Sequence, residues 1–348
     1  MTQENEVLFD VQGCLGLITL NKPKALNALS LNMVVSIHNQ LIVWASDKTI
    51  ELIVIKADGN RAFCVGGDVR ALYDNRGTNY GSEFCGKEYL LNTYLFNYPK
   101  PYLAFMDGAV MGGGVGVSIH GSHRIVTERT IFAMPETGIG LFPDIGAGWF
   151  LPRCPGEIGM YLGLTGYRLN AADCIYSGLA DYYIPSNSLD TVVDKLSQID
   201  VTRSNINDVL DEISIRGYES TLDQIKKSID RCFSADSVED IISRLREEKS
   251  DWAEETINII TLKSPTSLKI TFKQLRAGAS MKIFEDVMAM EYRIATHVYK
   301  GCDFFEGIRA VVIDKDGKPN WDPSSLEEVA SIDVDEYFKK VNGEPSFR

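Results

Sequence analysis

The sequence contains little of what metal, redox and nucleic-acid sites usually require. Only 4 of its 348 residues are His, and its 7 Cys residues are scattered without a Cys-x-x-Cys pair. This odd, dispersed set predicts reduced thiols in a reducing compartment. Lys and Arg number 35 against 48 Asp and Glu, and the resulting net charge of −13 argues against a nucleic-acid partner.

Long apolar runs are also missing. The longest, around Ala109 to Ile119, is too short and too rich in glycine to span a bilayer. The segment Met1–Glu6 is acidic and precedes no apolar stretch of signal length, and no Arg-rich transit peptide is visible. We therefore expect no membrane partner and a cytoplasmic location, or the mitochondrial matrix if the chain is a processed eukaryotic protein.

Three short motifs resemble known sites, but each lacks a residue that its chemistry needs. Gly81–Glu88 matches a phosphate-binding loop except that Glu88 stands where Ser or Thr would bind magnesium. Gly116–His120 resembles a nucleophile elbow without the closing glycine, which disfavours a serine hydrolase. His120 and His123 have no Glu or Cys at ligand spacing. We expect neither a bound metal nor a cofactor.

The pattern of apolar residues predicts an α/β fold. From Leu15 to about Ile184, short β-rich runs alternate with helical patterns, as in a domain whose helices cover a sheet. The predicted strands are Leu15–Leu20, Glu51–Lys56, Pro101–Met106, Arg124–Thr127 and Asp181–Ile184. The predicted helices there are Ser30–Ala45, with Ser30 as its N-cap, Glu83–Phe96 and a third after Gly113.

Beyond about residue 200 the sequence changes to long amphipathic runs that predict helices. These runs are Val238–Thr261, Ser264–Gly278 and Met281–Lys300, and a loop is expected over Val311–Pro319. We therefore predict a catalytic core over residues 1–200 and a mainly helical region over residues 201–348.

Two carboxylates stand out because of their neighbours. Glu136 and Asp144 lie eight residues apart in a segment rich in glycine, proline and large apolar side chains. Burying an ionised carboxylate without a partner is costly, so each is expected to be paired, protonated or poised for chemistry.

Two glycine-rich turns precede this segment. They are Val65–Asp68 and Met111–Gly116. Glycine permits the tight turns that aim backbone N–H groups at a ligand, and two such donors stabilise the oxyanion formed at a thioester carbonyl. Gly67 and Gly113 are the glycines best suited to this role. Together with the carboxylates, the turns predict a site that holds an oxyanion.

The strings that contain these residues are similar to those of the crotonase (enoyl-CoA hydratase/isomerase) superfamily. The similarity extends from about residue 10 to 325. Its motifs are Asn21–Leu29, Phe63–Asp68, Met111–Gly116, Phe132–Thr137, Gly140–Asp144, Phe150–Arg153 and Phe304–Ala310.

This resemblance implies a crotonase-like spiral of ββα units that binds an acyl-CoA, with a helical C-terminal region. The N–H groups of Gly67 and Gly113 are then expected to hold the thioester oxygen. The resemblance assigns the catalytic carboxylate to Glu136, a second active-site carboxylate to Asp144 and a substrate contact to Glu88. The CoA is part of the substrate rather than a cofactor.

One departure from the superfamily pattern narrows the expected reaction. Hydratases of this superfamily use two glutamates, and one of them falls where this chain has Gly116. The chain is therefore expected to hydrolyse an acyl-CoA thioester. Glu136 would attack the carbonyl or activate a water, and Asp144 would bind a substrate 3-hydroxyl or position the attacking group.

Two alternatives stay open at this point. One is an enoyl-CoA hydratase or isomerase, and the other is a non-catalytic acyl-CoA-binding protein on the same fold. Residues 201–348 are expected to cover the site or to mediate self-association, which leaves a homo-oligomer open.

Overall fold

The computed structural model describes residues 5–348. The chain folds into two compact units. Unit 1 contains the chain up to residue 67 together with residues 90–132 and 168–223. Unit 2 contains residues 68–89, 133–167 and 224–348. The units do not divide at residue 200, because the segments that carry Glu88, Glu136 and Asp144 pack with the later helices.

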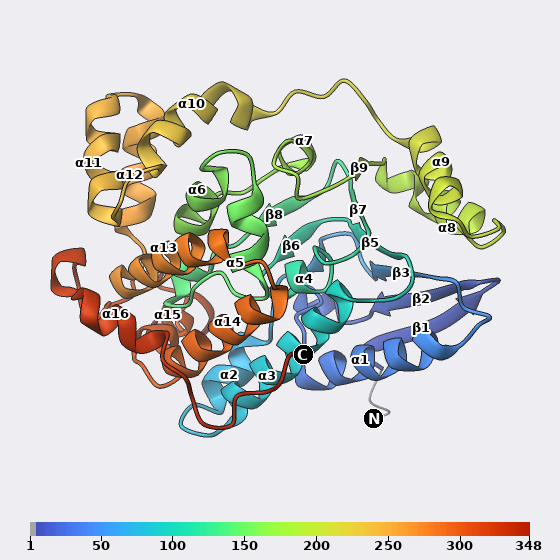
Figure 1. The fold of residues 1–348 in the computed structure, drawn as a ribbon, viewed down its shortest axis with the longest axis horizontal. Coiled ribbons are helices and arrows are strands. Elements are labelled where there is room, and N and C mark those ends of the chain that lie inside the picture. The colour runs from blue at the N-terminus through green and yellow to red at the C-terminus, as the bar shows by residue number, and fades with distance from the viewer. Residues whose placement is uncertain (1–4) are drawn as a thin grey trace. The chain divides into compact units, whose positions relative to one another are not determined.

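Unit 1 is built on a six-stranded sheet with the order β1-β2-β3-β5-β7-β9 (Figure 1). β1 and β2 are antiparallel, and the other neighbours are parallel. The strands are β1 (Val7–Gln12), β2 (Leu15–Leu20), β3 (Leu52–Ala57), β5 (Tyr102–Met106), β7 (His123–Val126) and β9 (Tyr182–Tyr183).

A smaller sheet has the order β4-β6-β8. Its strands are β4 (Ala62–Cys64), β6 (Ala109–Met111) and β8 (Ile131–Ala133). Because β3, β5 and β7 are each followed along the chain by a strand of this smaller sheet, and β4 and β6 lead into helices, the chain forms the predicted ββα units.

All five predicted strands are present, with ends that differ by at most one residue. The strands that sequence analysis missed are β1, β4, β6 and β8. Three of them have only three residues, too few for an alternating pattern to be visible. In β1 the alternation is weakened because Leu8 and Val11 are exposed.

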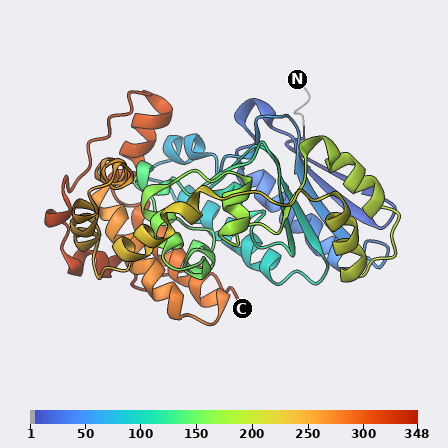
Figure 2. The same cartoon turned by 90° about the horizontal axis from the view of Figure 1, so that it is seen from above.

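Helices cover both faces of the large sheet of unit 1. α8 (Leu189–Leu196) and α9 (Arg203–Ile213) pack on the face that carries Leu15 and Leu17 (Figure 2). α1 (Leu31–Ser46) packs on the opposite face, where the Trp44 ring closely approaches Gly16. As predicted, Ser30 caps α1, and its side chain accepts the Met33 N–H at 3.1 Å.

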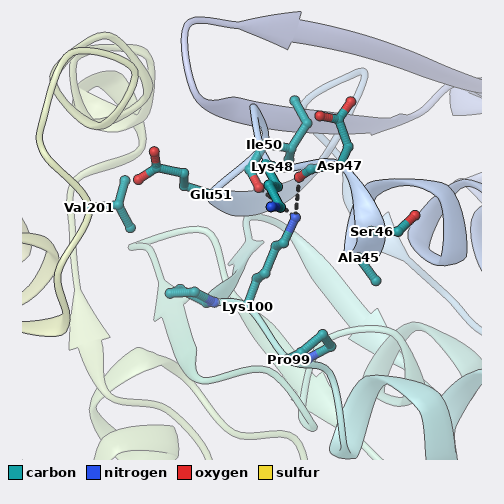
Figure 3. Close-up of a pocket in the computed structure, with 10 residues that line it drawn as sticks. Ala45, Ser46, Asp47, Lys48, Ile50, Glu51, Pro99, Lys100 and Val201 are labelled. Atoms are coloured by element: carbon teal, nitrogen blue, oxygen red, sulfur yellow. Dashed lines mark hydrogen bonds between the residues drawn. The ribbon is translucent and has the colours of Figure 1, made fainter.

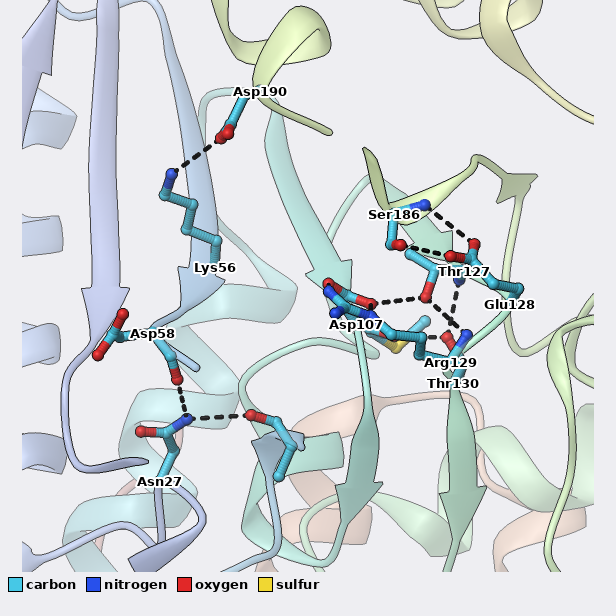
Figure 4. A network of polar contacts seen from close by, with 12 residues as sticks. Asn27, Lys56, Asp58, Asp107, Thr127, Glu128, Arg129, Thr130, Ser186 and Asp190 are labelled. Atoms are coloured by element: carbon cyan, nitrogen blue, oxygen red, sulfur yellow. Dashed lines mark hydrogen bonds and ion pairs between the residues drawn. The ribbon is translucent and has the colours of Figure 1, made fainter. Parts of the chain in front are cut away.

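Hydrogen bonds brace the turns at the ends of these strands (Figure 4). Asp107, directly after β5, accepts hydrogen bonds from the Thr127 hydroxyl at 2.7 Å and from Arg129 Nε at 2.8 Å. Glu128, after β7, accepts the Ser186 N–H at 3.0 Å. The turns after β5, β7 and β9 are therefore joined in one network.

The remaining helices of unit 1 are short, and unit 2 is mainly helical. Residues 80–89 of α3 belong to unit 2, and the rest of that helix belongs to unit 1. The α-helices of both units other than α1, α8 and α9 are α2 (Val69–Asp74), α3 (Tyr80–Phe96), α4 (Gly113–Gly116), α5 (Ala147–Phe150), α6 (Ile158–Thr165), α7 (Ala171–Tyr176), α10 (Thr221–Phe233), α11 (Val238–Glu248), α12 (Asp251–Thr261), α13 (Pro265–Ser280), α14 (Phe284–Val298), α15 (Asp303–Ile308) and α16 (Ser331–Tyr337).

Short helical turns complete the chain. The 3₁₀ turns are η1 (Pro23–Ala25), η2 (Glu136–Ile139), η3 (Leu151–Arg153), η4 (Ser186–Ser188) and η6 (Leu326–Glu328), and η5 (Arg309–Ile313) is a π-helix. In the described part of the chain, no helix has the length and apolar character needed to cross a membrane.

Two predictions for the later part of the chain differ from the structure. The single run expected over Val238–Thr261 is two helices, because Lys249 has a left-handed φ of 53° and Ser250 caps α12. The loop expected from Val311 begins later, since η5 continues to Ile313.

Candidate active site

The two glycine-rich turns lie side by side in unit 1. β4 and β6 are parallel neighbours, so the turns that follow them leave the small sheet at the same edge. A Cβ added to Gly66 would lie 3.6 Å from Gly113 N, and one added to Gly114 would lie 2.2 Å from Cys64 O. The second contact is too short for any side chain, so this close approach requires glycine.

Both candidate oxyanion donors are unused in the described structure. Among the described residues, neither the Gly67 N–H nor the Gly113 N–H has a hydrogen-bond acceptor. Gly113 is the first residue of α4, where a helix leaves its N–H groups without intrahelical partners. Two fixed N–H donors on neighbouring turns are the arrangement that binds an oxyanion.

The Asn21–Leu29 motif supports the first of these turns. Asn27 is buried, and its side-chain amide donates to Asp58 O at 3.1 Å (Figure 4) and to Ala62 O at 3.0 Å. Leu29 N donates to Gly66 O at 2.8 Å. The motif thus holds the chain directly before Gly67.

Unit 2 contains Glu136, the first residue of η2. Its side chain is buried, with 4% exposure, and its Oε2 has no hydrogen-bond partner in the described structure. Burial raises the pKa of Glu136 well above its ordinary value, and Asp144 and Glu88 raise it further. Lys263 partly opposes this shift in the pKa of Glu136. Glu136 therefore has a raised proton affinity and an oxygen without a partner in the described structure, which makes it a candidate reacting group.

Two close backbone contacts hold the turn that carries Glu136. A Cβ added to Gly307 of α15 would lie 2.4 Å from Ile139 C. Gly140, with a φ of 69°, would place a Cβ 2.3 Å from Asp303 C. Both glycines let α15 pack directly on η2, which explains why the C-terminal Phe304–Ala310 motif accompanies the Glu136 motif.

Asp144 lies in the same unit and has a specific partner. The Tyr89 hydroxyl donates to Asp144 Oδ2 at 2.7 Å, and both side chains are buried. Burial raises the pKa of Asp144 to about 6, while the hydrogen bond from Tyr89 lowers it. Asp144 therefore titrates near neutral pH, and Tyr89 favours its ionised form.

Glu88 is the third predicted carboxylate of this group. It is 4% exposed on α3, and its Oε1 has no hydrogen-bond partner among the described residues. Burial, followed by the charge of Asp144, raises the pKa of Glu88 well above its ordinary value. The structure thus groups the predicted residues into two sets, the glycines in unit 1 and the carboxylates in unit 2.

Glu291 of α14 is another buried carboxylate of unit 2, and the sequence-based predictions did not include it. It has 0% exposure and accepts the Gly146 N–H at 2.6 Å and the Gly148 N–H at 2.8 Å. Burial raises the pKa of Glu291 to about 8, against the lowering effect of these hydrogen bonds. A signal was present, because Val287, Glu291 and Ile294 follow helical spacing and place this Glu on an apolar face.

Other candidate groups are already used by the fold. The Ser118 hydroxyl donates to Gly114 O at 2.8 Å and lies in the turn after α4, which supports the case against a serine nucleophile. At Gly116 the backbone carbonyl accepts a hydrogen bond from the Asn92 side chain at 3.0 Å. In the part of the chain that the structure describes, no three His, Cys, Asp or Glu side chains are grouped to hold a metal ion.

An open pocket of about 400 Å³ in unit 1 contains Lys100 (Figure 3). Its ammonium donates to the carbonyl oxygens of Trp44, Asp47 and Ile50 near the C-terminal end of α1, the last two at 2.6 Å. These contacts cap the end of α1 and engage all three ammonium hydrogens. We therefore assign Lys100 a structural role.

Comparison with known proteins defines the class to which this chain belongs. The model of the enoyl-CoA hydratase/isomerase family matches residues 15–338. The chain belongs to this family. The chain is also similar to individual relatives over nearly its whole length.

The similar relatives include 3-hydroxyisobutyryl-CoA hydrolases that carry the word mitochondrial in their names. The protein from Xenopus tropicalis is 45% identical over 347 residues, which cover 97% of this chain and 90% of the relative. The human protein is 44% identical over 344 residues, which cover 97% and 89%.

Solved structures of related enzymes share the fold. A carnitinyl-CoA dehydratase from Mycobacterium thermoresistibile has a TM-score of 0.93 at 37% identity, and the match covers 99% of each chain. An enoyl-CoA hydratase from Rhodobacter sphaeroides has a TM-score of 0.90 at 35% identity, covering 98% of this chain and 99% of that one. These matches confirm the predicted fold class, whereas the roles of the individual site residues stay predictions.

Proposed function

We propose that this chain hydrolyses the thioester of 3-hydroxyisobutyryl-CoA, and of similar small β-hydroxyacyl-CoAs, to the free acid and CoA. The observation that carries this proposal is the state of Glu136. It is buried, and one of its oxygens has no hydrogen-bond partner in the part of the chain that the structure describes. The chain is also 45% identical to a 3-hydroxyisobutyryl-CoA hydrolase. A reacting carboxylate and a hydrolase relative point to the same chemistry.

The proposal gives each candidate residue a chemical task. The N–H groups of Gly67 and Gly113 bind the oxyanion that forms when the thioester carbonyl is attacked. In one route Glu136 attacks the carbonyl carbon, the C–S bond breaks, and CoA leaves as a thiolate that takes up a proton; water then hydrolyses the acyl–glutamyl anhydride to the free acid and restores Glu136. In the other route Glu136 removes a proton from the water that attacks the carbonyl, and the proton passes to the leaving thiolate. Asp144 and Glu88 contact the substrate, with Asp144 assigned to its 3-hydroxyl group.

The two routes for Glu136 predict different states of the enzyme during turnover. An anhydride would leave the acyl group on Glu136, whereas an activated water would leave the side chain unmodified. Rapid acid quenching followed by mass measurement of the peptide that contains Glu136 separates them. A mass increase equal to the acyl group indicates the anhydride.

The test of the reaction itself is release of CoA thiol from 3-hydroxyisobutyryl-CoA by the purified chain, in a panel with acetyl-CoA and crotonyl-CoA. We expect fast thiol release from the β-hydroxyacyl substrate and little from acetyl-CoA. Loss of the enone absorbance of crotonyl-CoA without thiol release would instead identify a hydratase. CoA binding without turnover of any thioester would identify a binding protein.

Absence of a second glutamate favours hydrolysis over hydration. The residue at the hydratase position is Gly116, whose carbonyl accepts a hydrogen bond from Asn92. This position therefore supplies no acid or base for adding water across a double bond. Cellular location and oligomeric state stay predictions.

A further inference from the structure

The turn that carries Asp144 has an unfavourable backbone. Ala147 N donates to Asp144 O at 2.9 Å, so residues 144–147 form a β-turn. Its central residues, Ile145 and Gly146, have φ values of 55° and 91°, as in a type I′ turn. A β-branched residue such as Ile145 rarely adopts this left-handed conformation, so the surroundings must hold it there.

Two side chains from the C-terminal helices hold this turn. Glu291 Oε2 accepts the N–H of Gly146 at 2.6 Å, and Glu291 Oε1 accepts the N–H of Gly148 at 2.8 Å. Gln274 of α13 donates its side-chain amide to Pro143 O at 2.7 Å and to Glu291 Oε1 at 3.0 Å. The backbone is therefore held on both sides of Asp144.

The side chains of Glu291 and Gln274 lie directly against the backbone at Gly148. A Cβ added to Gly148 would lie 3.1 Å from Glu291 Oε1 and 3.4 Å from Gln274 Nε2. Glu291 and Gln274 both have 0% exposure, so neither can exchange these hydrogen bonds for bulk water without local opening. The side chains act on the backbone of the turn, while Tyr89 contacts the Asp144 carboxylate directly.

We propose that Glu291 and Gln274 are positioning residues that hold the Pro143–Gly148 segment in the conformation in which Asp144 works. This inference rests on the proposed function, because it takes Asp144 to be a residue of the active site. It gives α13 and α14 a role in the reaction, in addition to the expected roles of covering the site or mediating self-association. A purely structural role predicts lower stability and unchanged turnover instead.

The test compares Glu291→Gln with the wild-type chain. Glutamine keeps the shape of the side chain but replaces one acceptor oxygen by an amide donor. The hydrogen bond from Gln274 favours an oxygen at Oε1, so the new NH₂ faces the Gly146 N–H next to Ile145. We expect kcat for thiol release to fall roughly 10- to 100-fold, as for a small misplacement of a catalytic group. KM should rise less than about threefold, because Asp144 is the only proposed substrate contact that is displaced.

A matched control is Asp173→Asn in unit 1. Asp173 is also a buried carboxylate that accepts backbone N–H groups, from Thr221 at 2.9 Å and Leu222 at 3.4 Å. This variant should lose stability while its kcat stays within about twofold of the wild type. The control separates the effect of replacing a buried carboxylate by an amide from the effect of displacing Asp144.

Hydrogen exchange gives a readout that does not depend on activity. Deuterium uptake in a peptide covering residues 141–150 should rise in Glu291→Gln and stay unchanged in Asp173→Asn. If Glu291→Gln does not fold, Gln274→Met removes the donors to Pro143 and Glu291 and should give a smaller change in the same direction.

The outcomes separate this inference from the proposed function. If the wild-type chain releases thiol and folded Glu291→Gln has a normal kcat, the positioning role is overturned and the proposed function stands. A wild-type chain that releases no thiol would overturn the proposed function. The exchange experiment would still show whether Glu291 and Gln274 hold the Pro143–Gly148 segment. Unchanged deuterium uptake over residues 141–150 in Glu291→Gln would overturn the positioning role in either case.

Discussion

Asp173 in unit 1 and Glu136 in unit 2 are both buried carboxylates, but their surroundings are opposite. Asp173 in unit 1 is 1% exposed and accepts hydrogen bonds from Ser220, Thr221 and Leu222. Glu136 in unit 2 is 4% exposed, and one of its oxygens has no hydrogen-bond partner among residues 5–348. A buried carboxylate with many donors joins segments of the fold, whereas one that lacks them is available for chemistry.

Among the predicted site residues, the groups without a hydrogen-bond partner in the described structure differ in kind between the units. In the described part of unit 1, the backbone N–H groups of Gly67 and Gly113 lack acceptors. In the described part of unit 2, carboxylate oxygens of Glu88 and Glu136 lack donors. Thioester hydrolysis needs both kinds of group, a donor for the oxyanion and a carboxylate for the attack. The predictions below test this division of tasks.

The largest effect is expected from Glu136→Gln. The amide keeps the size of the side chain but can neither attack a carbonyl nor accept a proton, so kcat should fall roughly 10²- to 10⁴-fold. The measurement is thiol release from 3-hydroxyisobutyryl-CoA, with Asp173→Asn as the matched amide substitution in unit 1. Near-normal turnover in Glu136→Gln would contradict the assignment of the reacting group.

A somewhat smaller effect is expected from Gly113→Pro in unit 1. Proline removes the N–H, and the first position of a helix is the one where its ring is best tolerated. Losing one oxyanion donor should lower kcat about 10²- to 10³-fold.

The control for this prediction is Gly113→Ala, which keeps the N–H and should lose much less activity. Equal losses in the alanine and proline variants would mean that space at this position matters and the N–H does not. Circular dichroism of both variants checks that each remains folded.

The regular parts of unit 1 could be predicted from sequence because their signals are local. Ser30 caps α1 where expected, and strand β2 has the expected bounds. The two glycine-rich turns could be predicted for the same reason, since the glycines of each turn are a few residues apart, and the role of Gly67 and Gly113 as oxyanion donors stays a prediction. The three-residue strands were missed because no periodic pattern fits in so short a segment.

The candidate site in unit 2 could be predicted only in part, because its contacts join distant segments. Glu136 and Asp144 share one motif and were predicted together, and both are buried. Tyr89 lies 55 positions from Asp144, and Glu291 lies 145 positions from Gly146. Nothing local in the sequence indicates that a tyrosine donates to a particular carboxylate. Helical spacing around Glu291 indicated burial, but its hydrogen-bond partners required the structure.

Tyr89→Phe tests whether the ionised form of Asp144 matters. The Tyr89 hydroxyl lowers the pKa of Asp144, which burial raises to about 6. Removing this donor should raise the pKa of Asp144 further, so a higher pH is needed to ionise it. Losing one hydrogen bond to a charged carboxylate should raise its pKa by about one to two units.

The expected result is an acid limb of the kcat–pH profile that moves upward in Tyr89→Phe. Activity should therefore fall about tenfold at pH 6 and much less at pH 8, given a shift of that size. The profile is measured by thiol release between pH 5 and pH 9. An unchanged acid limb would show that ionisation of Asp144 does not control the rate.

The smallest effect concerns stability, and its sign should differ between the two units. Burial raises the pKa of Glu136 above its value in the unfolded chain, so the folded state binds the proton more tightly. The stability that results is present at low pH and is lost as the pH rises toward the folded-state pKa. Glu136→Gln does not ionise, so it should be more stable than the wild type, by about 0.5–2 kcal/mol at pH 8 and less at pH 5.

Asp173→Asn should behave in the opposite way, because a neutral amide replaces a charged acceptor of several hydrogen bonds. Its NH₂ would also face the Asn170 N–H, which now donates to Oδ2 at 3.5 Å. Its expected loss is about 1–3 kcal/mol. Thermal melting of both variants at pH 5 and pH 8 checks the pair. If Glu136→Gln melted below the wild type at pH 8, its carboxylate would be stabilising the fold, and the contrast between a structural carboxylate in unit 1 and a reactive one in unit 2 would not hold.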